Sequence, residues 1–154
     1  MQFTPRRGRP KETIKDPHIK ILDNFFKKIR KLLESKKKTG EKLEVGDILS
    51  RDPEINQMII ENEWLTIVKR YFLRIKRFYD FGARYSRVYR EKTGREPEKE
   101  LRVKLEKSMD EDIEKILSEF ATRIKEELPE LSDATIKYFI RRIKEEAKWT
   151  ASFL

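Results

Sequence analysis

Cysteine is absent from this 154-residue chain, and histidine occurs once, at His18. Without cysteine the chain can form no disulfide, no cysteine-based zinc site and no Fe–S ligand set. One histidine is too few for a metal centre built on imidazoles. A glycine-rich phosphate loop, a G-x-S-x-G motif and a Cys or His nucleophile system are also missing from the sequence. We therefore expect a protein that is not an enzyme by itself and that holds no cofactor.

Long hydrophobic runs are missing too. No apolar stretch approaches the 18 residues of a membrane span, and the N-terminus lacks the apolar core of a signal peptide. We expect an intracellular, cytoplasmic protein with no membrane contact. Hydrophobic residues make up 37% of the chain and charged residues 42%, which is a lean composition. The length is nevertheless sufficient for one domain with its own core.

Positive charge is abundant and concentrated. The chain carries a net charge of +9, and ten of the 27 residues in Lys69–Arg95 are Lys or Arg. Seven aromatic residues lie among them, but only two acids, Asp80 and Glu91. A focused basic segment binds phosphates with release of counterions, and aromatic rings offer surfaces for base stacking. The alternative is a solvated helix face paired with acidic neighbours, and the scarcity of acids favours a nucleic-acid or nucleotide binder.

Hydrophobic spacing follows the helical period almost throughout, and no segment alternates long enough to form a strand. The sequence predicts an all-α fold, a compact multi-helix bundle over residues 16–154 that follows a flexible basic N-terminal arm, residues 1–15. The dipeptide Asp-Pro, which combines an N-cap with a first helical residue, predicts helix starts at Asp16 and Asp52. The polar segment 35–46 between them is expected to be a loop.

The middle of the chain predicts two helices separated near a glycine. The first is expected to bury a stripe of apolar residues, and the chain then turns or kinks around Gly82. The second continues with an apolar face and ends at Gly94. The residues expected in the core of the first helix are Trp64, Leu65, Val68, Phe72, Ile75 and Phe78, and those on the apolar face of the second are Phe81, Tyr85, Val88 and Tyr89.

The last third of the chain predicts three helices. A weak helix over residues 98–108 precedes a strong one that Asp110 caps and Pro129 ends, and Ser132 caps the last. The acidic cluster at the start of the strong helix could suggest metal ligation. Its position favours capping and compensation of the helix dipole instead. The cluster consists of Asp110, Glu111, Asp112 and Glu114.

Arginines on the basic segment are the candidates for phosphate contact. Three of them fall at i, i+4 and i+7 and share a helix face. Arg84 lies at the edge of the following apolar stripe, where partial desolvation would strengthen a bidentate phosphate contact. Among the tyrosines, Tyr71, Tyr79 and Tyr89 are expected at the rim of the core. The arginines in question are Arg70, Arg74, Arg77, Arg84, Arg87 and Arg90.

The N-terminal segment PRRGRPKE, residues 5–12, adds three arginines, Arg6, Arg7 and Arg9. Its Arg-Gly-Arg-Pro core resembles an AT-hook, in which a cationic strand lies in a narrow A·T minor groove. A disordered basic tail explains the same residues. Either reading adds affinity for nucleic acid.

Two segments resemble the C-terminal helical domain of the large, non-catalytic subunit of archaeal and eukaryotic primases. They are FGARYSRVYREKTG, residues 81–94, and DEDIEKILSEFATRIKEELPELSDATIKYFIRRI, residues 110–143. Size, charge and the missing cysteines are most similar to the small accessory primase subunits of crenarchaea. The family's histidine three residues before its central arginine is Phe81 in this chain.

The resemblance implies a site for the initiating nucleotide or the primer 5′-triphosphate. Arg84 matches the central phosphate-binding arginine of that family, and Lys76 matches a basic position upstream. Tyr138, Arg141 and Arg142 match the second segment, and Arg74 and Arg77 are expected to assist in neutralising the phosphates. The family's four cluster cysteines are absent, so the resemblance implies no Fe–S cluster here.

These observations lead to two functional hypotheses. The first is a non-catalytic accessory subunit of a DNA primase, which binds nucleoside triphosphate and single-stranded DNA template. Its partners are the primase catalytic and large subunits, with the divalent metal in the catalytic partner. The second is a free-standing DNA-binding protein, such as a plasmid, regulatory or chromatin factor. A third possibility is an interaction scaffold whose charge serves only solubility.

Overall fold

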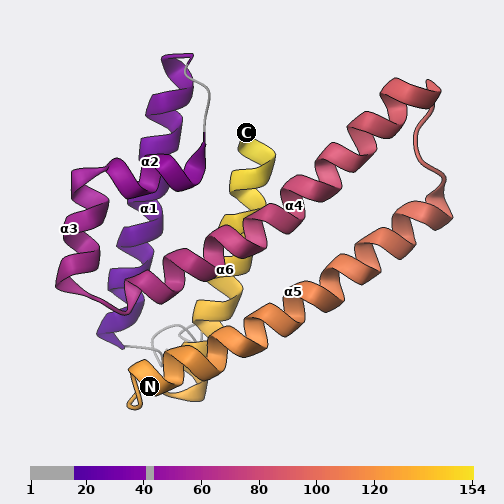
Figure 1. Ribbon diagram of the computed structural model, residues 1–154. Helices are drawn as coiled ribbons and strands as arrows, with labels where there is room; N and C mark the ends of the chain where they lie inside the picture. The colour runs from indigo at the N-terminus through magenta and orange to yellow at the C-terminus, as the bar shows by residue number, and fades with distance from the viewer. Residues whose placement is uncertain (1–15, 41–43) are drawn as a thin grey trace, which may run out of the picture.

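The structure is a computed structural model that describes residues 16–40 and 44–154 (Figure 1). The described part contains six helices and no strand, which confirms the predicted all-α fold. The N-terminal arm with Arg6, Arg7 and Arg9 lies outside the described residues. The helices are α1 (Pro17–Lys38), α2 (Val45–Arg51), α3 (Pro53–Glu61), α4 (Leu65–Thr93), α5 (Lys99–Glu127) and α6 (Asp133–Phe153).

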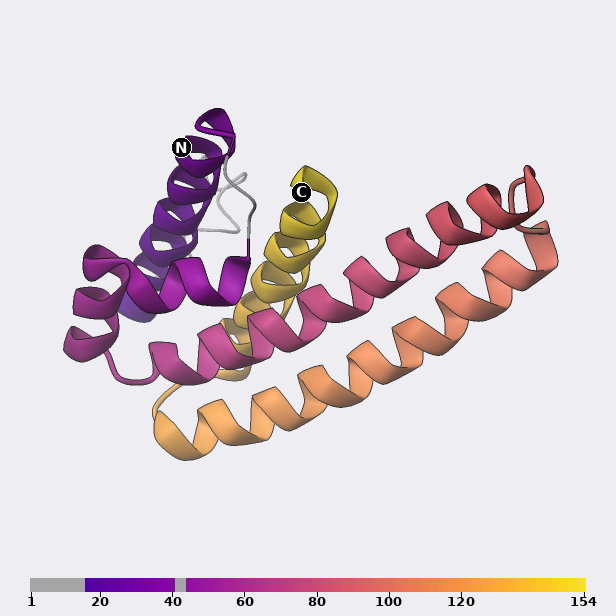
Figure 2. The ribbon, with the colours of Figure 1, turned by 45° about the horizontal axis from the view of Figure 1, so that its top comes forward.

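One hydrophobic core joins α1, α6, the first half of α4 and the second half of α5. The two long helices α4 and α5 run antiparallel, α6 packs against both, and α1 lies beside α6 (Figures 1 and 2). Ring contacts connect these layers: Trp64 stacks on Phe139, and Phe26 meets Phe72 edge-on at 5.4 Å between centroids. The largest fully buried side chains include Phe25, Phe26, Tyr71, Phe72, Phe120 and Phe139.

Local capping explains where the helices begin and end. The Asp16 carboxylate accepts a hydrogen bond from the His18 amide at 2.8 Å, and Asp52 caps α3 in the same way. The Ser132 hydroxyl accepts from the Thr135 amide at 3.2 Å and begins α6. Gly94 ends α4 with a φ of 72°, a conformation that glycine adopts without strain. All four boundaries confirm the sequence prediction.

The predicted turn at Gly82 is wrong, because α4 runs unbroken through it. Gly82 faces α5 at a close approach: a Cβ on this residue would lie 3.1 Å from the Met109 sulfur. The glycine therefore allows two helices to pack closely, and its weak helix propensity is overridden by tertiary contact.

The helix start predicted at Asp110 is also wrong. α5 is continuous from Lys99, with Glu98 at the N-cap, so the acidic cluster lies inside the helix and caps nothing. The earlier half of α5 lies against α4, where Met109 approaches Gly82. Within the described residues, no group of His, Asp and Glu side chains is arranged to hold a metal ion.

The loop expected over residues 35–46 is shorter than predicted. α1 continues to Lys38, and α2 begins at Val45. The short α2 buries Val45 and Leu49 in the core, and that burial stabilises a helix whose sequence has no side-chain cap.

Beyond the core, α4 and α5 continue as a projecting hairpin, which we define as residues 76–93 and 99–112 joined by 94–98. Figures 1 and 2 show this hairpin extending away from α1, α2 and α3. No helix in the described part of the chain combines the length and apolarity needed to cross a bilayer.

Candidate nucleic-acid interface

Four arginines lie on the outward side of α4. Arg70, Arg77 and Arg84 are spaced seven residues apart, so they share a face at intervals of about 10.5 Å, and Arg87 follows one turn later. All four side chains are exposed. Among the residues that the structure describes, none of the four has a hydrogen bond or ion pair with an acid. We call these four residues the α4 arginine row.

The partial desolvation expected for Arg84 is not observed, since its side chain is exposed. Arg84 lies on the projecting hairpin, where the neighbouring apolar stripe is itself open to solvent: Phe81 is 53% exposed and Val88 37%. An exposed guanidinium is screened by salt and contributes to phosphate binding mainly as one member of a set.

Arg74 belongs to a different cluster from the row. Its guanidinium donates to Glu119 of α5 at 2.9 Å, and the Tyr71 hydroxyl donates to the same carboxylate oxygen. The two hydrogen bonds, from Tyr71 first and Arg74 second, lower the pKa of Glu119 below its usual value. Tyr71 is buried rather than at the rim, and burial followed by the Glu119 hydrogen bond raises its pKa. Arg74 is thus compensated within the protein.

Two further basic candidates are also paired. Lys76 forms an ion pair with Asp80 one turn later at 2.6 Å, and its side chain is only 14% exposed. Arg90 donates to Glu96 at 3.1 Å near the tip of the hairpin. Such pairs reduce the charge available to a phosphate ligand.

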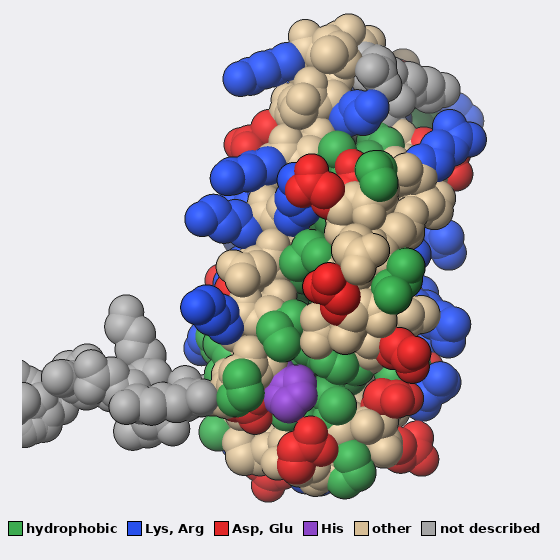
Figure 3. Space-filling model, turned by 90° about the vertical axis from the view of Figure 1, so that its left-hand side faces the viewer, with side chains coloured by type: hydrophobic (Ala, Val, Ile, Leu, Met, Phe, Trp, Pro, Cys, Tyr) green, Lys and Arg blue, Asp and Glu red, His purple; other side chains and the backbone are tan. Residues whose placement is uncertain are grey.

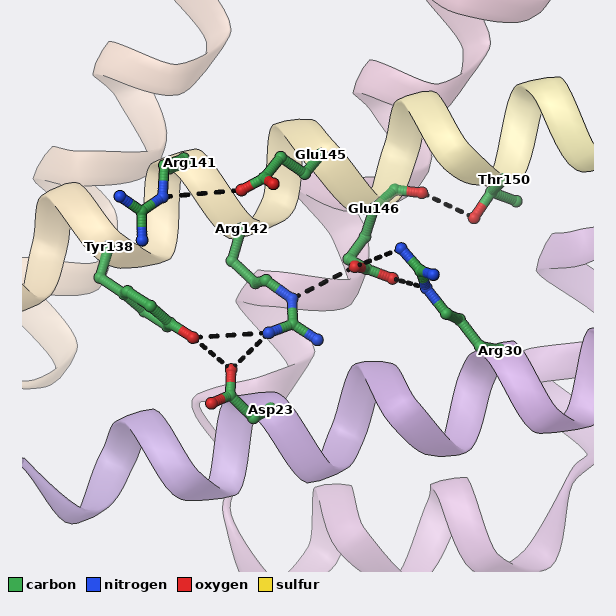
Figure 4. Close-up of polar contacts among 8 residues, drawn as sticks. All are labelled: Asp23, Arg30, Tyr138, Arg141, Arg142, Glu145, Glu146 and Thr150. Carbon is green, nitrogen blue, oxygen red and sulfur yellow. Dashed lines mark hydrogen bonds and ion pairs between the residues drawn. The ribbon is translucent and has the colours of Figure 1, made fainter. Parts of the chain in front are cut away.

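The α6 candidates take part in a polar network with α1 (Figure 4). The Tyr138 hydroxyl and Arg142 both donate to Asp23, each at 2.7 Å, and Arg142 also donates to Glu146 at 3.2 Å. Arg30 of α1 binds Glu146 through two hydrogen bonds of 2.7 and 2.9 Å. This network joins α1 to α6. Its hydrogen-bond donors are already bound to carboxylates of the protein, which leaves them little capacity to bind a phosphate ligand.

Arg141 lies outside this network. Its exposed side chain points toward Glu145 at 3.6 Å and lies over the Tyr138 ring, 5.2 Å from the centroid. Of the three α6 candidates, it offers the most accessible charge.

The network perturbs its own titratable groups. Burial raises the pKa of Tyr138 above its usual value, and the hydrogen bond to Asp23 adds to the rise. Desolvation lowers the pKa of Arg142, but the carboxylates of Glu146 and Asp23 outweigh it and the net shift is upward. Both groups therefore stay in their physiological protonation states.

The sequence did not reveal Glu146 and Asp23 as the hydrogen-bond partners of the basic residues and tyrosine in this network. Glu146 is 4% exposed and lies on the apolar face of α6 beside Ile143 and Ala147. A carboxylate at an apolar position, four residues after Arg142, was the available signal for a buried ion pair. Asp23 on α1 carried no comparable signal, because its partners are more than a hundred residues away.

The structure does not bring the predicted phosphate ligands of α4 together with those of α6. Tyr138 and Arg142 face α1 (Figure 4), whereas Arg84 lies on the hairpin that extends away from α1 (Figure 1). On the face formed by the left-hand side of Figure 1, hydrophobic and acidic side chains occupy the centre and basic ones lie mostly toward the edges (Figure 3). Among the predicted phosphate ligands that the structure describes, the α4 arginine row combines exposure with the absence of an acidic partner.

Comparisons with protein-family models, with curated proteins and with solved structures find no match to this chain.

Proposed function

We propose that this protein binds nucleic acid through the α4 arginine row. The observation that carries the proposal is the regular spacing of exposed arginines with no acidic partner among the described residues. From Arg70 to Arg84 the row is about 21 Å long, close to the rise of six nucleotides in one strand of a duplex. A row of this length suits a phosphate backbone.

A finer proposal is an accessory, non-catalytic subunit of a DNA primase. The resemblance of residues 81–94 and 110–143 to the primase large-subunit domain supports it. In this proposal Arg84 and Arg77 contact the 5′-triphosphate of the initiating nucleotide or primer. The subunit accelerates primer synthesis by positioning nucleotides for a catalytic partner, which lowers the entropic part of the barrier. The divalent metal belongs to that partner.

A free-standing DNA-binding protein is the second candidate, and one feature favours it. Tyr138 and Arg142, which a compact triphosphate site would use, are engaged with Asp23 and Glu146. The arginines of the α4 row form a line rather than a pocket, and a line contacts successive phosphates of a polymer.

The shared part of both proposals is tested by charge removal. Fluorescence anisotropy is measured with single-stranded and duplex DNA for the full chain and for the triple variant Arg70→Gln/Arg77→Gln/Arg84→Gln. The salt dependence of log K should decrease in slope by about 2 for single strands or about 3 for duplex. The matched control is Lys20→Gln/Lys27→Gln/Lys31→Gln, which removes three exposed charges from α1. Equal effects of the two triple variants would refute a specific role for the row.

The two finer proposals differ in the end chemistry they require. An oligonucleotide with a 5′-triphosphate should bind about tenfold tighter than its 5′-hydroxyl counterpart, or 1.4 kcal/mol, if the protein is an initiation subunit. Arg84→Ala should then weaken triphosphate binding by about 1–3 kcal/mol. Equal binding of both ends, with duplex competing better than single strand, identifies a general DNA-binding protein instead.

A further inference from the structure

An exposed aromatic ring lies within the α4 arginine row. Phe81 is 53% exposed, follows Arg77 by four residues and precedes Arg84 by three. Residues at these spacings are neighbours on a helix face, so an exposed arginine lies one turn to either side of the ring. A single exposed hydrophobic residue is common on a protein surface. A ring between two arginines is more specific, because any ligand that covers the ring also meets both positive charges.

Two further rings follow Phe81 along the hairpin. The centroids of Phe81 and Tyr85 lie 6.5 Å apart, and those of Tyr85 and Tyr89 lie 6.3 Å apart. Phe81 is the exposed member of this series, and the two tyrosines are half-buried. We call these three residues the aromatic ladder. Each spacing is close to twice the rise of about 3.4 Å per nucleotide in one strand, so the rings recur at a distance that matches every second base.

A shallow groove beside Phe81 provides room for a base. It has a volume of about 380 Å³, which is within the range of small-ligand sites, and the apolar side chains of Leu105 and Met109 line it together with the ring. Arg77 lies on its α4 side and the exposed Asp112 on its α5 side. The arginine attracts a phosphate and the aspartate repels one, so the backbone of a bound strand runs along α4 and its bases point toward α5.

We propose that the nucleic acid bound by the α4 arginine row is single-stranded and that Phe81 stacks on one of its unpaired bases. This inference rests on the proposed function, because it names the form of nucleic acid that the row binds. A nucleotide supplies an apolar base face and a negative charge in one unit. That combination matches a ring with an arginine one turn to either side, and proteins that bind single strands pair a basic surface with stacking aromatics in this way.

A duplex cannot use the ring in the same way. Its base faces are covered by the neighbouring base pairs, and only the base edges are accessible in the grooves. The contribution of Phe81 is therefore confined to single strands, whereas the arginines contact the phosphates of either form. This difference separates the role of the ring from that of the row.

The test compares an intact single-stranded oligonucleotide with an abasic strand of the same length, which keeps every phosphate but has no bases. Fluorescence anisotropy at one salt concentration should show that the full chain binds the intact strand at least about fivefold tighter, the lower limit for one stacked base. Phe81→Leu keeps an apolar side chain but has no aromatic face. It should weaken binding of the intact strand by at least about fivefold and leave binding of the abasic strand unchanged, with helix content preserved because Phe81 is exposed.

Two further variants complete the series. Phe81→Trp should bind the intact strand at least as tightly as the natural chain, and its tryptophan emission should fall on binding more than that of the natural chain, because the added indole stacks on a base. Ile60→Ala is the matched control: Ile60 is 68% exposed on α3, and its loss should leave the binding of both strands unchanged.

The outcomes distinguish this inference from the proposed function. Equal binding of the intact and abasic strands, with binding still lost in the arginine-row variant, would overturn base stacking and leave the row in place. A chain that binds neither strand would refute both. A duplex of the same sequence should compete less well than the single strand, and Phe81→Leu should not change its affinity. An equal loss for duplex and single strand would also overturn the inference, because the side chain would then act as a wedge between paired bases.

Discussion

The network between α1 and α6 makes a sharp prediction for Glu146→Gln. The Glu146 side chain is almost fully buried and accepts three hydrogen bonds from two arginines, Arg30 and Arg142. Glutamine keeps the volume of the side chain but removes its negative charge. Its amide NH2 group is a hydrogen-bond donor, so it cannot accept a hydrogen bond from the guanidinium groups that surround it. At most one of its two terminal atoms can still accept a hydrogen bond from Arg30 or Arg142.

The magnitude follows from the burial of each partner. Removing one member of a buried ion pair costs about 3–5 kcal/mol when the other charge is left without solvent. Here the Arg30 side chain is 39% exposed and that of Arg142 23%, and Arg142 keeps its 2.7 Å contact with Asp23. Water and Asp23 compensate part of the loss, so we expect a decrease of about 2 kcal/mol in the free energy of unfolding. For a chain of this size that corresponds to a fall in Tm of about 4–8 °C.

The assay is urea unfolding followed by far-ultraviolet circular dichroism. Glu145→Gln is the matched control, because it removes a carboxylate from the adjacent position, where Glu145 is 63% exposed and 3.6 Å from Arg141. An exposed pair of this kind contributes less than about 1 kcal/mol. If the two variants lose equal stability, the polar network does not hold α1 to α6 and this reasoning is refuted.

Two other substitutions test the hairpin and its base. Gly82→Ala should stabilise the chain by about 0.5–1 kcal/mol, because it removes a glycine from a helix interior and the flexible Met109 side chain can shift to make room. A loss of stability in urea unfolding would show that Met109 cannot move. Tyr71→Phe should reduce the loss of stability at alkaline pH. Burial raises the pKa of Tyr71 in the folded chain above 10.0, so its stabilising contribution is complete below about pH 10 and is lost as pH rises through the folded pKa; an identical decline in both proteins between about pH 9 and 11 would contradict this cause.

The boundaries that the sequence predicts correctly depend on neighbouring residues alone. Asp16, Asp52 and Ser132 cap helices through contacts two or three residues away, and Gly94 ends one through its own φ. These interactions act within one turn of helix, so they are visible in a short window of sequence.

The hairpin could not be predicted from local signals. Gly82 has weak helix propensity, and Asp110 is a common N-cap, so both indicated breaks that do not exist. Their real environment is the antiparallel contact between α4 and α5, in which Gly82 meets Met109. That contact joins residues 27 positions apart, and no periodicity within either helix encodes it.

The candidate site likewise has some features that helical spacing predicts and others that depend on contacts between helices. Helical spacing alone places Arg70, Arg74 and Arg77 on one face. Arg84 shares a face with Arg70 and Arg77 only because α4 runs unbroken through Gly82, and the structure leaves all three exposed. Spacing could not show that Arg74 binds Glu119 or that Arg142 binds Asp23, because the partner in each case lies on another helix. It also could not show that Arg84 stands on a projecting element with no core beside it.

The sequence by itself determined the all-α class, the helix ends with local caps and the concentration of positive charge on α4. Each of these depends on residues within a few positions of one another. Only the tertiary structure decided which basic side chains are neutralised, which remain free for a ligand, and that α4 and α5 continue past the core with an apolar side exposed. Those outcomes depend on which helices pack together, and packing is set by contacts between residues far apart in the chain.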